Sequence, residues 1–167
     1  CSTSMEGLAL ASFIINYGGA NKILTGASSH NTTVEKQFRY PTEYGGQRPP
    51  TAQWTVTGAG VALVEKNDNS SESKLVVTSA TIGKVVDMGL KDPFNMGGAM
   101  APAAVDTIYH HFRDLNLDED HYDLVVTGDL GKIGHDTAID LLEQKGLKLN
   151  KEKFKDCITY GQNYIDA

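Results

Sequence analysis

Cysteine is scarce in this chain of 167 residues, which contains only Cys1 and Cys157. Two cysteines do not suggest a disulfide framework, so the composition fits a reducing compartment. Basic residues are fewer than acidic ones, with 15 lysines and arginines against 21 aspartates and glutamates, so the formal net charge is −6 at pH 7. Phosphate backbones bind basic surfaces, so this balance argues against a nucleic-acid partner. Long apolar runs are also missing, and no stretch approaches the roughly 20 residues that a membrane span needs.

The residues that are present suit one globular core of moderate size. Apolar periodicity and turn residues predict an alternation of helices and strands in the order α-β-loop-β-β-α-β-α-β. Strands joined through helices imply an α/β fold with a parallel or mixed sheet. One expected helix follows Cys1 and ends near residue 15, and two more cover 99–116 and 133–145. The expected strands cover 22–26, 53–66, 74–84, 122–127 and 157–160.

Cys1 directly precedes Ser2, Thr3 and Ser4, which are favoured residue types at the start of a helix. The helix that follows is apolar on all sides, so we expect it to be buried. The positive end of such a helix favours a thiolate or a bound anion. One interpretation is a small buried residue that happens to precede a helix. The other is a nucleophile or anion site of the kind used in acyl transfer.

A second candidate site lies at the ends of the expected strands, where open α/β sheets bind their ligands. The glycine-rich turn of residues 128–132, GDLGK, opens a helix, so an anion is expected to bind there. It lacks the Gly-Lys-Ser/Thr of a nucleotide-binding loop. His30 and His135 lie near the same strand ends, although a hydrogen-bonded surface histidine is the simpler interpretation of each. No two of the 5 histidines have the spacing of a zinc site.

Several strings resemble known proteins. The string CSTSMEGLALA at residues 1–11 resembles the nucleophile-cysteine helix of the thiolase and ketoacyl-synthase superfamily. Residues 58–64 resemble its dimer-forming edge strand, and residues 124–127 resemble the strand that bears its first catalytic histidine. The longer strings YGGQRPPTAQWT, DPFNMGGAMAP and VTGDLGK resemble one divergent branch, the stage V sporulation protein AD family of spore-forming bacteria. This resemblance covers nearly the whole chain.

The resemblance implies a thiolase-like layered α/β/α/β/α fold, present here as an internal fragment. Residues 1–73 would end the N-terminal half of that fold, and residues 74–167 would begin its C-terminal half. The start at a cysteine and the stop soon after an expected strand agree with an internal piece of a longer protein. The resemblance also implies a homodimer that lies peripherally at the spore inner membrane beside channel subunits. Its role there would be the uptake of dipicolinic acid, as the calcium chelate, into the developing spore.

One departure from the superfamily decides between catalysis and binding. Gly128 stands where acyl-transferring relatives carry their first histidine, and the second histidine position falls near Asn163. Glycine has no side chain to act as a base or to stabilise an oxyanion. We therefore expect a non-catalytic binding protein without a cofactor or a metal of its own. The expected ligand-binding residues are Cys1, Arg48, Gly128, Asp129, Lys132 and Asn163.

Two alternatives stay open. In the first, the chain belongs to an acyl-transferring enzyme with Cys1 as its nucleophile. In the second, it is a structural subunit whose role is its dimer surface or its contacts with membrane-channel partners. If calcium travels with the ligand, Asp129 is the carboxylate that stands nearest in the sequence.

Overall fold

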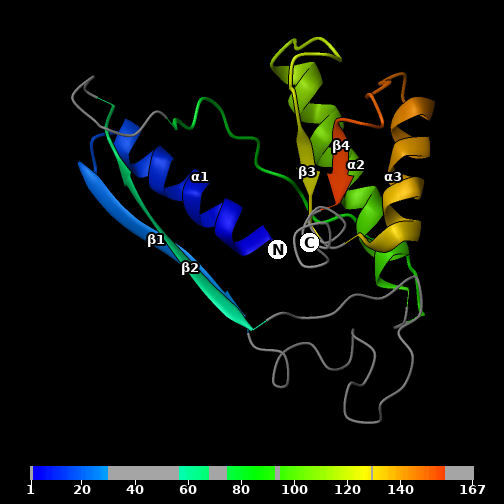
Figure 1. Ribbon diagram of the computed structural model, residues 1–167, viewed down its shortest axis with the longest axis horizontal. Helices are drawn as coiled ribbons and strands as arrows, with labels where there is room; N and C mark the ends of the chain where they lie inside the picture. Colours follow the sequence, from blue (N-terminus) through cyan, green and yellow to red (C-terminus); the bar gives the residue numbers. More distant parts are fainter. Residues whose placement is uncertain (1, 30–56, 68–74, 93–94, 129, 157–167) are drawn as a thin grey trace, which may run out of the picture. The chain divides into compact units, whose positions relative to one another are not determined.

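The computed structural model describes residues 2–29, 57–67, 75–92, 95–128 and 130–156. The chain divides into two compact units (Figure 1). Unit 1 consists of Cys1–Asn31 and Thr55–Ala80, and unit 2 consists of Thr32–Trp54 and Thr81–Ala167. In the described segments, no helix combines the length and the apolar character needed to cross a membrane.

Unit 1 contains one helix and one pair of strands. Helix α1 spans Ser2–Asn16, and strands β1 (Lys22–Ser29) and β2 (Gly58–Glu65) pair antiparallel. The register runs from Lys22 opposite Glu65 to Ser29 opposite Gly58. The helix predicted at the start of the chain and the strands predicted at 22–26 and within 53–66 are therefore confirmed.

The predicted burial of this first helix is wrong for unit 1. Ala11 and Ile15 are buried, but the side chain of Phe13 is 57% exposed. An apolar sequence on every side does not bury a helix that packs against a single two-stranded layer. The strand predicted at 22–26 was also expected to be buried, yet Leu24 is 72% exposed.

Unit 2 is a parallel strand pair with two helices. Helix α2 spans Met96–Asp114, strand β3 Val125–Thr127, helix α3 Gly131–Gln144 and strand β4 Phe154–Asp156. β3 and β4 are parallel, with Val125 opposite Phe154, and α3 connects them. The expected parallel pairing through a helix is confirmed. The final strand lies just before the predicted 157–160, a range outside the described residues.

The core of unit 2 forms where the two helices and the strands meet. Helical spacing places Ala101, Val105 and Phe112 on one side of α2, and all three are buried. The core residues of unit 2 are Ala101, Val105, Phe112, Leu130, Ala138, Ile139, Leu142, Leu147 and Phe154.

Helix boundaries differ from the sequence prediction at both helix starts. α2 begins at Met96 rather than near residue 99, because the side chain of Asn95 accepts a hydrogen bond from the Gly98 N–H. α3 begins at Gly131 rather than at residue 133. It ends close to the prediction, where Gly146 adopts a φ of 85° that glycine tolerates best.

One predicted strand is wrong. Residues 75–84, expected to form a strand, belong to no strand or helix in the described structure. Their β-branched composition favours extended backbone, but a strand also needs a neighbour for its ladder of hydrogen bonds. Ile82 in this segment is 90% exposed.

Candidate functional site

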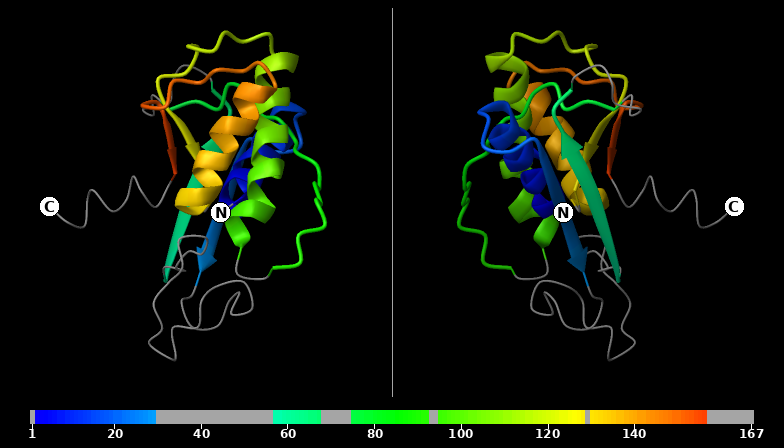
Figure 2. Two further views of the ribbon diagram at one scale, coloured as in Figure 1. Left: turned by 90° about the vertical axis from the view of Figure 1, so that its right-hand side faces the viewer. Right: turned by 90° about the vertical axis from the view of Figure 1, so that its left-hand side faces the viewer.

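The starts of helices α2 and α3 lie side by side in unit 2. At this end, Gly97 of α2 packs against the Leu130 carbonyl and against Gly134 of α3. At the opposite end, the Lys145 ammonium lies 5.1 Å from the centroid of the Tyr109 ring. The helices are therefore parallel, and both views show them next to each other (Figures 1 and 2).

The close approach depends on two glycines that face each other. A Cβ atom built on Gly134 would lie 2.7 Å from the Cα of Gly97 and 2.9 Å from its carbonyl carbon. Both distances are well inside van der Waals contact, which for two carbons is about 3.5–4.0 Å. Main chain thus meets main chain at this crossing, and no other residue type fits without moving a helix.

Two positive helix ends converge at this crossing. The first N–H groups of a helix have no partner within the helix, and the aligned peptide dipoles add a partial positive charge there. Asn95 satisfies one N–H at the start of α2, with Oδ1 3.0 Å from Gly98 N. Among the described residues, no side chain caps the start of α3, and neither helix carries an acidic residue in its first turn.

Lys132 adds a full positive charge to the first turn of α3. A cation is unfavourable at the positive end of a helix, where an anion or a carboxylate would stabilise it. The Lys132 side chain is exposed, and it has no ion-pair partner within the described part of the chain. The combination of two helix starts and a lysine favours a negatively charged ligand.

Strand β3 leads directly into this end of unit 2. Buried Thr127 closes the strand, and its hydroxyl donates a hydrogen bond of 3.4 Å to the Lys155 carbonyl in β4. Gly128 follows, and its carbonyl accepts a 2.7 Å hydrogen bond from the Leu130 N–H. The tight turn then delivers the chain to the start of α3. Its geometry agrees with ligand sites at the carboxyl ends of parallel strands.

His135 is held to strand β4. Its Nε2 atom lies 3.2 Å from the Phe154 carbonyl oxygen, and its ring lies 4.9 Å from the Phe154 ring centroid. The imidazole therefore anchors α3 to the sheet. His30, the other histidine expected near the strand ends, lies outside the described residues.

The structure places two of the six predicted ligand-binding residues. Gly128 and Lys132 lie at the same end of unit 2, on either side of the turn that opens α3. Cys1, Arg48, Asp129 and Asn163 lie outside the described residues. Across the ranges that the structure describes, no group of three or more histidine, cysteine, aspartate or glutamate side chains is placed to hold a metal ion.

Sequence reasoning missed the contribution of α2 to this site. The glycines at positions 97 and 98 were assigned to a loop, so the helix start was placed after them. Asn95 was the available signal, because asparagine is among the strongest helix-capping residues and stands three positions before the N–H that it binds.

Comparison with known proteins gives two matches. A family model of the Stage V sporulation protein AD (SpoVAD) matches residues 1–163. The Stage V sporulation protein AD of Bacillus subtilis (strain 168) is 51% identical over 157 residues, which cover 94% of this chain and 45% of that protein. The chain thus spans less than half the length of that curated relative.

Proposed function

Because this chain belongs to the stage V sporulation protein AD family, we propose that it forms part of a sporulation protein that binds dipicolinic acid. The ligand would be taken up into the developing spore as its calcium chelate, and no acyl transfer would occur. The single observation that carries the proposal is the convergence of two helix starts beside Lys132 without any acidic residue in their first turns.

The ligand chemistry suits this arrangement. Dipicolinic acid is a flat molecule with two carboxylates, both ionised near neutral pH. Backbone N–H groups at a helix start bind carboxylate oxygens, and the lysine ammonium adds charge-assisted hydrogen bonds. Cys1, Arg48, Asp129 and Asn163 complete the proposed site, with Asp129 as the residue that meets a calcium ion carried by the ligand.

The absence of catalysis is proposed from the residues beside the turn. Gly128 occupies the position after β3 where acyl-transferring relatives carry a histidine, and it has no group to accept a proton. His135 lies in the next helix, but its Nε2 atom is already 3.2 Å from the Phe154 carbonyl oxygen. A cysteine without a base has no group to activate its thiol.

We extend the proposal to the whole protein. The full-length protein would have a thiolase-like layered fold and form a homodimer that pairs through the strand Gly58–Glu65. It would lie peripherally at the spore inner membrane beside channel subunits. Among the described residues, β1 and β2 form a sheet of two strands, which supports the pairing of a further strand with β2.

Calorimetric titration of the protein with dipicolinate tests the binding, with and without calcium. The informative variant is Lys132→Ala, and the matched control is Lys145→Ala, which removes the same charge just beyond the opposite end of α3. A charge-assisted hydrogen bond contributes about 1.5–3 kcal/mol, so we expect Lys132→Ala to weaken binding at least about tenfold. Lys145→Ala should bind like the wild type.

Two results would contradict this function. If dipicolinate shows no measurable binding at millimolar concentration, with or without calcium, it is not the ligand of this protein. If the Lys132→Ala and Lys145→Ala variants bind dipicolinate with equal affinity, the ligand does not bind at the start of α3. A parallel assay with acyl-CoA thioesters tests the enzyme alternative, for which mass spectrometry would detect an acyl group on Cys1.

A further inference from the structure

A segment of unit 2 without helix or strand lies against helix α2. We call residues 81–92 the strap; it begins at Thr81, where the chain passes from unit 1 to unit 2 for the second time. No helix or strand forms within it. Several of its apolar side chains face solvent, and Val85 is 93% exposed. Burial of these side chains therefore contributes little to holding the strap in place.

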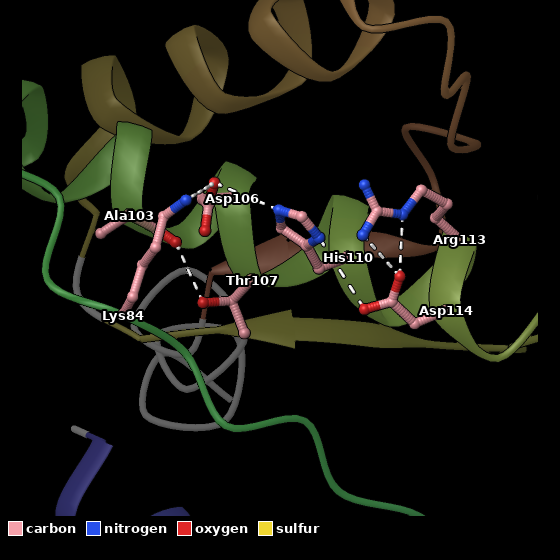
Figure 3. Close-up of polar contacts among 7 residues, drawn as sticks. All are labelled: Lys84, Ala103, Asp106, Thr107, His110, Arg113 and Asp114. Atoms are coloured by element: carbon pink, nitrogen blue, oxygen red, sulfur yellow. Dashed lines mark hydrogen bonds and ion pairs between the residues drawn. The ribbon is translucent and has the colours of Figure 1, made fainter.

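Three polar or close contacts attach the strap to α2. Thr81 Oγ1 lies 2.7 Å from His111 Nδ1. Lys84 Nζ lies 3.2 Å from Asp106 Oδ1, and Figure 3 shows the lysine reaching from the strap to the helix. Between these points Gly83 packs so closely on Thr107 that a Cβ atom would lie 2.7 Å from its hydroxyl. The contacts follow one side of α2 over about a turn and a half.

His111 links the strap to a second segment as well. Its Nε2 atom lies 2.7 Å from the hydroxyl of Tyr122, which precedes strand β3. A neutral imidazole has one N–H donor and one acceptor nitrogen, and a hydroxyl is able to take either role. The neutral ring therefore joins Thr81 on the strap to Tyr122 with both of its nitrogens hydrogen-bonded.

Protonation is disfavoured at this position. Partial burial lowers the pKa of His111 below its ordinary value of 6.5, and the charge of His121 lowers it further. In the strap, the charged residue nearest to Thr81 in the sequence is Lys84, whose ammonium lies 3.2 Å from Asp106 Oδ1, and the strap carboxylates Asp87 and Asp92 come later. On the helix itself, His110 is the neighbour that contacts the carboxylates of Asp106 and Asp114, at 3.6 and 3.8 Å (Figure 3).

We propose that His111 is a pH-sensitive latch that fixes the strap to α2 while its ring is neutral and releases it in mild acid. A charged His111 is less well solvated among Thr81, Tyr122 and His121 than in water, so leaving this pocket becomes favourable. The surface ion pair of Lys84 with Asp106, with the lysine 65% exposed, is too weak to hold the strap alone.

Release would change one of the three chain connections between the two units. Thr81 is the first residue of unit 2 after the passage from unit 1, so the latch sets the point at which the chain leaves α2. Freeing the residues from Thr81 to Lys84 adds up to about 3.5 Å of reach for each residue. The latch would thereby lengthen one of the three chain connections between the units.

Nuclear magnetic resonance of the full chain tests the latch directly. The imidazole carbon shift of His111 reports its protonation, and the methyl order parameter of Thr81 reports the mobility of the strap. Between pH 7.5 and 5, we expect the Thr81 order parameter to fall with the same midpoint as the His111 titration. An order parameter that stays constant while His111 becomes protonated would overturn the proposal.

Two substitutions separate the latch from its neighbours. His111→Gln retains one donor and one acceptor but cannot be protonated, so its Thr81 order parameter should not vary with pH. His110→Gln alters the adjacent ring, which contacts Asp106 and Asp114, and should behave like the wild type. Loss of strap order on acidification in His111→Gln would assign the effect to another group and refute the latch. If His111→Gln fails to fold, the wild-type titration still decides the question.

Discussion

Replacing Gly134 with alanine should separate helices α2 and α3 and destabilise unit 2. The added Cβ atom would lie 2.7 Å from Gly97 Cα and 2.9 Å from the Gly97 carbonyl oxygen. Contact distances between carbons are about 3.5–4.0 Å, so the helices must move apart by about 1 Å. The obstructing atoms belong to the backbone, which has no rotamer that could relieve the overlap.

Two opposing contributions set the size of the effect. Alanine is favoured over glycine inside a helix by about 1 kcal/mol, which stabilises the variant. Overpacking of a well-filled interior costs about 1–3 kcal/mol, and separation of the helices also loosens the core around Ala101 and Ala138. We expect a net loss of about 1–2 kcal/mol in the free energy of unfolding, which lowers the Tm by about 2–8 °C.

Urea unfolding followed by circular dichroism measures this loss. The control is Gly60→Ala in β2, where a Cβ atom would have no neighbour within 4 Å, so the same chemical change should be neutral or slightly stabilising. Gly97→Ala adds a methyl group on the other side of the crossing. The Gly97→Ala/Gly134→Ala double variant should lose less than the sum of the two single losses, because one methyl already separates the helices. A Gly134→Ala variant as stable as the wild type would refute the backbone contact.

Three further predictions concern unit 2. Asn95→Ala removes the bond from Asn95 Oδ1 to the Gly98 N–H and should cost about 1 kcal/mol in urea unfolding, whereas Asn95→Asp should retain most of the stability. Leu142→Ala empties a core position that is 1% exposed and should cost about 2–5 kcal/mol; a loss below 1 kcal/mol would show that the site is not packed. Because the pKa of His111 is lowered in the folded protein, its contribution to stability is complete above pH 6.5 and is lost as the pH falls below that value. The free energy of unfolding at pH 7.5 and 5.5 should therefore differ more in the wild type than in His111→Gln.

Patterns that depend on neighbouring residues predicted much of the local structure. Helix α3 and its end at Gly146, the β1 strand and the parallel pairing of β3 with β4 follow from apolar periodicity, glycine positions and the alternation of element types. The turn that contains Gly128 was also placed correctly between β3 and α3. Each of these features is encoded within about a dozen residues, which is the range over which such patterns act.

Features that depend on distant partners could not be predicted in the same way. Residues 75–84 are as rich in β-branched side chains as a strand, yet they form none in the described structure. The burial of α1 depends on how many layers cover it. The candidate site needed the contact of Gly97 with Gly134, which are far apart in the sequence and carry no side chain whose chemistry signals the contact.

The glycine crossing also determines how motion passes through unit 2. Helices that are separated by side chains retain some slack, because rotamers adjust when one helix shifts. Gly97 and Gly134 leave no such slack, so a displacement of the α3 start must carry the α2 start with it. A molecule that pushes the start of α3 toward α2 would therefore displace both helix starts together. A ligand that binds at that end of unit 2 would thus act on the starts of two helices at once.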